Sequence, residues 1–269
     1  MENIILIETS TALCSTALVK DGVLASYRES SAPKAHASLT AVFIQEMLDE
    51  CGLTLSDCDA VCVSKGPGSY TGLRVGVSTA KGLCFGSGKP LIAVGTLDTL
   101  VAQAAEIAGS GAETAGQGEE TAGQGEELAG QGEELASQGE APRFIIPMID
   151  ARRMEVYTAV FETQNVIARS EATWQSRQIT ETAPAIIDET SFAEYLEQGP
   201  CLFIGDGAGK CADVIKHPNA HFHQCWPKAS SMLTPALDAL RKSDFQDVAY
   251  FEPFYLKEFV ATVSKKKLF

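Results

Sequence analysis

The stretch SKGPGSYTGLR, residues 64–74, marks the point where a strand of this chain is expected to turn into a helix. It follows the apolar run Ala60–Val63, which is typical of a buried strand. It leads into a helical pattern that extends from Gly72 to about Phe85. A buried strand followed directly by a helix indicates an α/β unit.

The glycines and the proline of this stretch allow a sharp turn. Pro67 restricts one φ angle, whereas Gly66 and Gly68 reach backbone conformations that other residues avoid. Ser69 or Thr71 is expected to cap the N-terminus of the helix. A phosphate loop is the alternative, but the spacing GxGxxxG differs from the P-loop and from the dinucleotide fingerprint. The pattern therefore favours a structural turn over a phosphate cradle.

The helix after this turn carries a stripe of small residues. Gly72, Gly76 and Ala80 recur every four residues, which would allow another helix to approach closely. Leu73 and Val77 flank the stripe and would add apolar contact. We expect the stripe to be a docking surface for a second helix. The residues alone leave open whether that helix belongs to this chain or to a partner.

Length and composition indicate an ordinary globular protein. The chain has 269 residues, enough for two compact lobes, and 45% of them are hydrophobic. No apolar run approaches the length that spans a bilayer, and the N-terminus is not expected to be a signal peptide. Eight cysteines without secretion signals are expected to be reduced thiols of a cytoplasmic protein. The net charge of −14 disfavours autonomous binding to nucleic acid.

A segment rich in glycine and glutamate divides the chain. It reads AGQGEET, AGQGEEL, AGQGEEL and ASQGEAP, and two glycines in nearly every repeat disfavour a helix. We expect residues 109–142 to be a disordered acidic tether. It would separate an N-terminal lobe that dimerises, residues 1–108, from a C-terminal lobe, residues 143–269. The final segment of the C-terminal lobe is expected to return to the N-terminal lobe.

Hydrophobic periodicity predicts a similar start for both lobes. The pattern of the N-terminal lobe is β-β-β-α-β-α-β-α, with Asp21-Gly22 as a hairpin turn. The C-terminal lobe also opens with two strands, so we expect a duplicated α/β unit, with part of residues 162–182 as an inserted loop. The predicted strands cover residues 4–7, 14–19, 23–30, 60–63, 91–94, 144–149, 154–161, 201–204 and 222–225, and the predicted helices cover residues 36–51, 72–85, 96 onward, 191–197, the stretch after GDGAGK, and 230–241.

Five motifs in this order resemble the bacterial TsaB family, also called YeaZ. They are ILIETSTALCSTAL at 5–18, GPGSYTGLR at 66–74, IDARRMEVY at 149–157, IGDGAGK at 204–210 and EPFYLK at 252–257. The resemblance covers nearly the whole chain, apart from the tether and part of the less regular stretch in the C-terminal lobe. It implies a two-lobed α/β fold of the actin/Hsp70/sugar-kinase (ASKHA) type, with duplicated βββαβαβα-type units.

The resemblance also implies a function and partners. Members of the family are accessory subunits for making N6-threonylcarbamoyladenosine at position 37 of tRNAs that read ANN codons. The implied role is a non-catalytic scaffold that binds and activates a TsaD-like transferase, while a TsaE-like ATPase joins the complex and uses ATP. Contact with tRNA would come only through the complex, and the chain could form a homodimer when alone. The expected interface comprises Gly72, Leu73, Gly76, Val77, Ala80, Leu39 and Phe43.

A stand-alone small-molecule kinase or ATPase is the alternative function. In nucleotide-binding proteins of the implied fold, three loops hold the nucleotide. Here the first loop offers a carboxylate followed by hydroxyls, but the second, residues 150–154, has bulky side chains where glycines would admit phosphate. The third loop, residues 205–209, is still glycine-rich. Independent phosphoryl transfer is therefore disfavoured, while a weak nucleotide site stays open. That site would comprise Glu8, Thr9, Ser10, Gly205 and Gly207.

No metal site and no catalytic residue is predicted. The HxxxH pair of the related catalytic subunits is reduced here to His36, because Thr40 stands at the second position. His221, His223 and Cys225 alternate as on one face of a strand and could gather a metal, but an exposed strand or loop is the favoured interpretation. A metallopeptidase is the least favoured function, because its zinc ligands and general base are not evident.

Three basic features have two interpretations each. Arg74 and Arg152 are either solvated or contact a phosphate or carboxylate of a partner. The tail Lys265-Lys266-Lys267 is typical of a solvated end, and contact with RNA inside a complex is the alternative.

Overall fold

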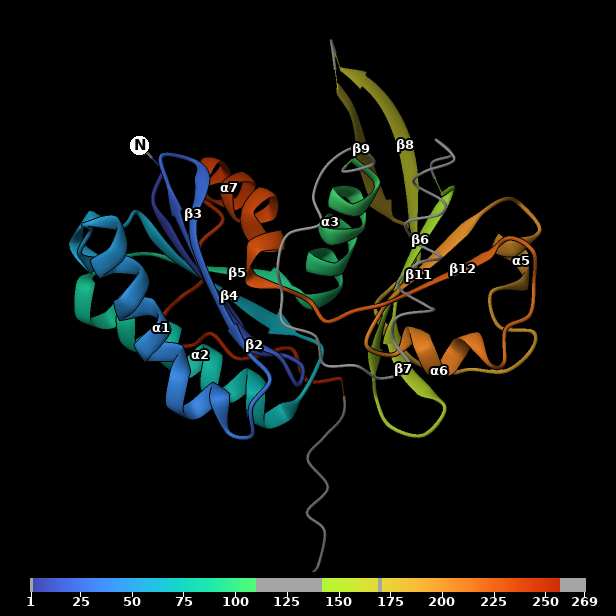
Figure 1. Cartoon of the computed structure of the whole chain (residues 1–269), viewed down its shortest axis with the longest axis horizontal. Helices are drawn as coiled ribbons and strands as arrows, with labels where there is room; N and C mark the ends of the chain where they lie inside the picture. Colours follow the sequence, from blue (N-terminus) through green and yellow to red (C-terminus); the bar gives the residue numbers. More distant parts are fainter. Residues whose placement is uncertain (1, 110–141, 169–170, 257–269) are drawn as a thin grey trace, which may run out of the picture.

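The computed structural model describes residues 2–109, 142–168 and 171–256 as two β-sheets with helices around and between them (Figure 1). The acidic repeats and the lysines of the C-terminal tail, on which two of the predictions fall, lie outside these described residues. Within the described part, no helix is both long enough and apolar enough to cross a membrane. The fold is a mixed α/β fold, as the hydrophobic periodicity predicts.

Five strands form the sheet of the N-terminal lobe in the order β3-β2-β1-β4-β5. Strand β1 is antiparallel to β2 and parallel to β4, so it lies at the centre of the sheet. Every residue of β1 is buried, because helices cover both faces of the sheet. The strands are β1 (Ile4–Glu8), β2 (Cys14–Lys20), β3 (Val23–Ser30), β4 (Ala60–Gly66) and β5 (Leu91–Gly95).

Two long helices, α1 (Ala35–Cys51) and α2 (Tyr70–Ser87), cover one face of this sheet and lie side by side (Figure 1). Both helices end at a glycine in the left-handed conformation, Gly52 and Gly88, which explains where the helical patterns stop. A short 3-10 helix, η1 (Leu55–Asp57), connects α1 to β4. The apolar stripes of α1 and α2 meet the inward side chains of the sheet and form the first core.

Helices from both halves of the chain lie between the two sheets. Helix α7 (Leu233–Lys242) and the 3-10 helix η2 (Ala229–Met232) pack on the second face of the N-terminal sheet. Helix α3 (Thr96–Gly109), although it follows β5 in sequence, buries Leu97 and Leu100 against the C-terminal sheet. Each sheet is thus covered by a helix from the other half of the sequence, and this exchange joins the two lobes (Figure 1).

The sheet of the C-terminal lobe has the path β10-β7-β6-β11-β12. Its strand β6 is antiparallel to β7 and parallel to β11, which are the same kinds of neighbours that β1 has. Two short helices, α5 (Ala193–Leu196) and α6 (Ala208–Ala212), complete the outer core of this lobe. The strands are β6 (Phe144–Asp150), β7 (Glu155–Thr158), β10 (Ala183–Ile186), β11 (Cys201–Gly205) and β12 (Ala220–Gln224).

The stretch expected to contain an inserted loop is instead a β-hairpin. Strands β8 (Phe161–Ala168) and β9 (Glu171–Gln178) pair with each other, and the hairpin extends beyond the body of the lobe (Figure 1). The single strand predicted for residues 154–161 is also wrong: β7 pairs with the carboxyl end of β6, and β8 pairs with its amino end. The residues of the hairpin are mostly polar, so no continuous apolar run marks these strands in the sequence.

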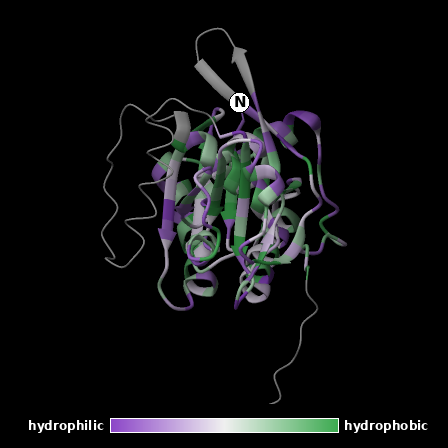
Figure 2. Cartoon of the chain, turned by 90° about the vertical axis from the view of Figure 1, so that its right-hand side faces the viewer, coloured by the Kyte–Doolittle hydropathy of each residue, from purple (hydrophilic) through white to green (hydrophobic). Residues whose placement is uncertain are grey.

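The last described residues, 246–256, return to the N-terminal lobe, and we call them the C-terminal segment. Gln246 donates its N–H to the carbonyl of Leu91 at 2.8 Å, which extends the edge at β5. Lys81 of α2 donates to the carbonyls of Ala249 and Phe251, at 3.1 and 3.0 Å. Figure 2 shows hydrophobic residues gathered on the central strands, with hydrophilic residues mostly toward the outside. The core thus lies on both faces of each sheet.

Candidate functional site

The glycine loop between β4 and α2 is the structural turn that the sequence favours. Gly66 has a φ of 105°, in the region that favours glycine. A Cβ atom at Gly68 would lie 2.4 Å from the carbonyl oxygen of Ser10, so only glycine allows the loop to pass this close to β1. The Ser69 hydroxyl accepts a hydrogen bond from the N–H of Gly72 at 3.3 Å. Ser69 therefore caps the helix, and it is one of the two residues, Ser69 and Thr71, that the sequence offers for this role.

The stripe of small residues faces its own sheet, so the prediction that it docks a second helix is wrong for these residues. A Cβ atom at Gly72 would lie 2.0 Å from the carbonyl oxygen of Thr9, and one at Gly76 would lie 2.2 Å from the Thr9 hydroxyl. That hydroxyl donates to the Gly72 carbonyl at 2.9 Å. The missing side chains let α2 approach the chain just after β1. Also buried in the lobe are Leu73, Val77 and Ala80.

The outer face of α1 and α2 carries a different set of residues. Leu39 and Phe43, the two predicted interface residues on α1, are partly exposed. Val42 is 45% exposed and Phe85 of α2 is 88% exposed. A Cβ atom at Gly82 would meet nothing within 4 Å, so this glycine lies under open space. The side of the two helices away from the sheet is therefore accessible, and it carries two exposed large apolar side chains, Val42 and Phe85.

A groove of about 510 Å³ opens on this surface, between the start of α1 and the first turns of α2. Tyr70, Thr71 and Arg74 line it. The Arg74 guanidinium donates to the Tyr70 hydroxyl at 3.1 Å. Tyr70 and Thr71 also line a second, larger cavity, so the first turn of α2 is a common wall between the two.

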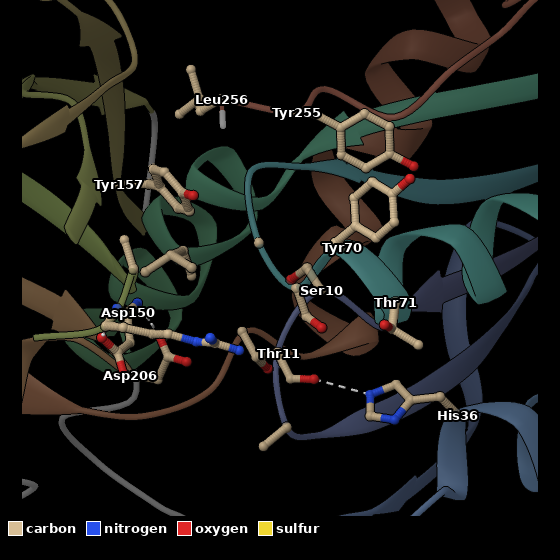
Figure 3. A pocket seen from close by; sticks show the side chains of 16 residues that line it. Ser10, Thr11, His36, Tyr70, Thr71, Asp150, Tyr157, Asp206, Tyr255 and Leu256 are labelled. Carbon is tan, nitrogen blue, oxygen red and sulfur yellow. Dashed lines mark hydrogen bonds between the residues drawn. The ribbon is translucent and has the colours of Figure 1, made fainter. Parts of the chain in front are cut away.

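The larger cavity is a cleft of about 770 Å³ between the lobes (Figure 3). Figure 3 shows Asp150 and Asp206 on one side of the cleft and Ser10 and Thr11 on the other. The ring of His36 is hydrogen-bonded through Nε2 to the Thr11 carbonyl at 3.0 Å. This places the histidine at the start of α1 beside the cleft.

Further lining residues come from sequence-distant elements, and they were not among the predicted site residues. Tyr157 on β7 and Tyr255 of the C-terminal segment are examples. The motif EPFYLK contains Tyr255, but nothing in the motif indicates that its ring lies against Tyr70. The contact joins residues that are far apart in sequence, and local patterns do not report such pairs.

Three successive backbone N–H groups at the loop after β6 donate to acceptors within the protein. The N–H of Asp150 donates to the Asp206 carboxylate at 2.8 Å, and the N–H of Arg152 donates to the Asp150 carboxylate at 2.8 Å. The N–H of Ala151 donates to the carbonyl of Glu155 at 3.0 Å. A loop that cradles phosphate needs such N–H groups free to point at the ligand. Here internal acceptors take them, and two of the acceptors are carboxylates.

Lys210 of α6 closes the same loop from behind. Its ammonium group is hydrogen-bonded to the Asp150 carboxylate and to the carbonyls of Arg153 and Glu155, at 2.8 and 2.7 Å for the carbonyls. Burial raises the pKa of the Asp206 carboxyl to about 6, and the nearby Asp150 adds to this rise. The acidic groups at this end of the cleft disfavour a bound anion.

The other two predicted nucleotide loops are also internally bonded. The N–H of Gly207 donates to the Met148 carbonyl at 3.0 Å, and a Cβ at Gly205 would lie 2.3 Å from that same oxygen. The N–H of Ser10 donates to the Glu8 carboxylate at 2.6 Å. Among the described residues, the predicted nucleotide set therefore contributes one residue, Ser10, to the lining of the cleft. Of that set, the following are buried against their own lobe: Glu8, Thr9, Gly205 and Gly207.

Glu8 is a fully buried carboxyl group at the end of β1. Burial raises its pKa to about 7, although hydrogen bonds from Ser10 and Ser64 act in the opposite direction. Its Oε2 atom has no hydrogen-bond partner among the described residues. The hydroxyl oxygens of Ser10 and Thr11 are also buried without a hydrogen-bond partner among the described residues. Burial thus destabilises a charged Glu8, and this residue is not among those that line the cleft.

The described residues contain no group of three or more His, Cys, Asp or Glu side chains that could hold a metal ion. His221 and His223 lie on β12, and His223 is buried. Burial raises the pKa of the Cys225 thiol to about 12. His217 is engaged through Nδ1 by the N–H of Asn219 at 3.1 Å, so it is directed into a local turn.

The fold and its loops define a class before any single relative is considered. The chain is a two-sheet α/β protein with a glycine-capped helix on its outer face and an interlobe cleft with bonded loops. A family model described as TsaD, tRNA N6-adenosine threonylcarbamoyltransferase, matches residues 23–113. This range extends from β3 through α3 and includes the glycine loop, so this part of the chain is similar to that transferase family.

Individual named proteins are similar to the whole chain or to part of it. The Escherichia coli (strain K12) protein named tRNA threonylcarbamoyladenosine biosynthesis protein TsaB is 27% identical over 264 residues, which cover 96% of each chain. The Haemophilus influenzae protein of the same name is 41% identical over 107 residues, 39% of this chain and 44% of that one. The structure of YeaZ from Pseudomonas aeruginosa has a TM-score of 0.70 at 23% identity and covers 95% of this chain and 100% of that one. The chain is thus similar, over nearly its whole length, to a protein named TsaB, and its fold is similar to that of YeaZ.

Proposed function

We propose that this chain is the non-catalytic subunit that binds and activates a TsaD-like transferase in the formation of N6-threonylcarbamoyladenosine in tRNA. The names of its relatives support a role in this pathway, and the matching family model supports a TsaD-like partner. The substrates of the complex are the tRNAs that read ANN codons, with the modified adenosine at position 37. The chain meets tRNA only as part of the complex.

The accessible side of α1 and α2, with Val42 and Phe85 exposed on it, is the observation that carries the proposal. On α2 the residues Arg74, Ser78, Gly82 and Phe85 are exposed and recur at three- and four-residue spacing, so they share one side of the helix. Phe85 is 88% exposed, and a large apolar side chain in that position suits burial by a partner. We call this surface the docking face; it consists of Leu39, Val42, Phe43, Arg74, Val75, Ser78, Gly82 and Phe85.

The state of the cleft supports a role without chemistry of its own. The loop after β6 gives its N–H groups to Asp206, Asp150 and the Glu155 carbonyl, so few donors remain there for a phosphate. The carboxylates themselves oppose the charge of a nucleotide. We therefore assign the ATP consumption of the complex to a TsaE-like ATPase that joins it. When no partner is present, the docking face is the surface through which two copies of the chain pair.

We extend the proposal to the architecture: the two lobes are duplicated units of an ASKHA-type fold. In support, β1 and β6 each have an antiparallel neighbour on one side and a parallel neighbour on the other. The proposed function requires the docking face on only one of the two lobes. That lobe is the N-terminal one, because it contains α1 and α2.

The test is co-purification with the TsaD-like subunit of the same organism, followed by a threonylcarbamoyl-transfer assay with and without this chain. Phe85→Asp places a charge on the docking face and is expected to weaken the complex at least ~10-fold and to remove activation. Ile186→Asp is the matched control, because Ile186 is 78% exposed on β10 and lies in the other lobe. Full transferase activity without this chain, or no complex with the unmodified chain, would reject the function.

A further inference from the structure

Arg74 is the cation of the groove on the docking face, and its head group is held by a tyrosine. Nη1 donates to the Tyr70 hydroxyl at 3.1 Å, and the guanidinium carbon lies 5.4 Å from the centre of the Tyr70 ring. The two residues are one helical turn apart, so both project from the same side of α2. The position of the guanidinium is therefore determined before a partner arrives.

Tyr70 is in turn supported by the C-terminal segment. The rings of Tyr70 and Tyr255 lie with centroids 4.8 Å apart at an interplanar angle of 38°, and Figure 3 shows the two rings facing each other. Phe254, the preceding residue, donates its N–H to the carbonyl of Lys65 at 2.7 Å, which fixes the segment to β4. Arg74 is thus held through a chain of contacts that begins at the end of the described sequence.

Arg74 has no acidic partner in the described part of the chain, although other basic residues do. Arg28, Arg177, Lys210, Lys228 and Arg241 each form an ion pair with a carboxylate. The groove around Arg74 is lined by hydroxyls and apolar groups, and no carboxylate is among its lining residues in the described chain. A fixed guanidinium with hydroxyl donors on either side is complementary to a carboxylate.

A protein carboxylate fits the groove better than the phosphates of a nucleic acid. Binding to a nucleic-acid strand needs several cations placed along the backbone, and the lining of this groove holds one. The net charge of −14 repels a polyanion as a whole. The exposed apolar residues Val42 and Phe85 near the helices' outer side suit the surface of a protein.

We infer that Arg74 is the anchor of the docking face and binds a carboxylate-bearing side chain of the partner subunit, with Tyr70 and Tyr255 holding the guanidinium in position. The inference rests on the proposed function, because it assigns the chemistry of the same face. Arginine and tyrosine dominate binding energy at protein interfaces, and a side chain ordered in advance loses less freedom on binding. The C-terminal segment thereby contributes to docking without touching the partner itself.

The first experiment measures the affinity of the co-purified TsaD-like subunit for this chain by titration calorimetry at two salt concentrations. Arg74→Gln is expected to weaken binding ~10-fold or more at low salt and to reduce the salt dependence of the affinity. Arg74→Lys keeps the charge but loses the planar fork, so it is expected to recover part of the affinity. Arg177→Gln is the charge-matched control, because its side chain is 70% exposed on β9, away from the docking face.

The second experiment separates positioning from general stability by a double-mutant cycle. Tyr70→Phe keeps the ring and removes the hydroxyl that Arg74 donates to, and Tyr255→Leu removes the ring that supports Tyr70. Each is expected to weaken binding by ~3-fold to ~10-fold in the unmodified chain and to have little further effect in the Arg74→Gln chain. Thermal unfolding of each variant, followed by circular dichroism, records whether the fold is intact. If Tyr70 and Tyr255 had a merely structural role, each substitution would destabilise the fold equally with Arg74 and with Gln at position 74.

The outcomes distinguish the inference from the function beneath it. An Arg74→Gln chain with unchanged affinity and unchanged salt dependence overturns the inference and leaves the proposed function standing. Equal losses from Tyr70→Phe and Tyr255→Leu in both backgrounds overturn the positioning role. If Arg74→Gln weakens self-association or tRNA binding but leaves the affinity for the TsaD-like subunit unchanged, the assignment of that subunit as the partner of Arg74 is overturned. No complex with the unmodified chain removes the proposed function and the inference together.

Discussion

The hydroxyl of Thr9 lies 2.2 Å from the place where a Cβ atom at Gly76 would be, so these two residues fix how closely α2 approaches the start of the cleft. The same hydroxyl donates to the Gly72 carbonyl one turn earlier in α2. The contact explains the glycine at both positions by packing within one lobe. It also moves the candidate docking surface to the opposite side of the helix, where side chains are exposed.

Gly76→Leu is expected to unfold or strongly destabilise the N-terminal lobe rather than disrupt docking alone. The new side chain would overlap Thr9 and Val63, and overpacking of this kind costs roughly 3 kcal/mol or more in the free energy of unfolding. Gly82→Leu is the matched control on the same helix, because a Cβ there meets nothing within 4 Å. It is expected to leave stability within ~1 kcal/mol, with a gain from helix propensity. Urea unfolding followed by circular dichroism measures both; equal stability of the two variants would contradict the packing explanation.

Ser69→Ala is expected to lower the free energy of unfolding by about 1 kcal/mol, because it removes the hydroxyl that accepts the N–H of Gly72. Ser78→Ala serves as the control, since Ser78 is an exposed residue in the middle of the same helix and its loss should cost less than ~0.5 kcal/mol. Urea titrations of the three proteins give the comparison. A Ser69 variant as stable as the Ser78 variant would argue against the cap.

Glu8→Gln is expected to make the stability of the protein less sensitive to a rise in pH from the ordinary pKa of Glu8, 4.5, to about 7. Burial raises the pKa of Glu8 from the ordinary 4.5 to about 7 in the folded chain, so the folded state binds the proton more tightly than the unfolded state. The stability that this protonated carboxyl contributes is fully present below the ordinary pKa and is lost as pH rises through about 7. Relative to the Gln variant, the unmodified protein should lose about 3 kcal/mol over this range.

The measurement for Glu8 is the difference in the free energy of unfolding between the two proteins, taken by urea titration from about pH 5 to about pH 8. Burial raises the pKa of Asp206 in the same direction, to about 6, but Asp206 is present in both proteins, so its effect cancels in the difference. A difference that stays constant with pH would show that Glu8 is ionised in the folded state.

Purified chain alone is expected to hydrolyse no ATP above the buffer rate in the presence of Mg²⁺. The reason is that backbone N–H groups near the cleft, such as those of Asp150 and Gly207, already donate to internal acceptors. A phosphate-release assay provides the measurement. Turnover that disappears in Glu8→Ala would instead revive the kinase or ATPase as a function of this chain.

Local patterns predict most of the secondary structure of this protein because the elements are strongly periodic. The apolar run Ala60–Val63, the turn chemistry of Gly66 and Gly68, and the cap at Ser69 all act within a few residues of sequence. The hairpin of β8 and β9 was not predicted, because its strands are mostly polar and their pairing joins residues that local patterns do not connect.

The sequence by itself determined that α2 has one side with almost no side chains, since a period near four follows directly from Gly72, Gly76 and Ala80. Only the tertiary structure decided what lies against that side, because small residues allow close approach of any backbone and do not select the chain it belongs to. The contact of Tyr255 with Tyr70, and with it the position of Arg74, likewise depends on the path by which the C-terminal segment returns to β4. Periodicity reports which face of an element is apolar or small, whereas the identity of the neighbour is a property of the assembled fold.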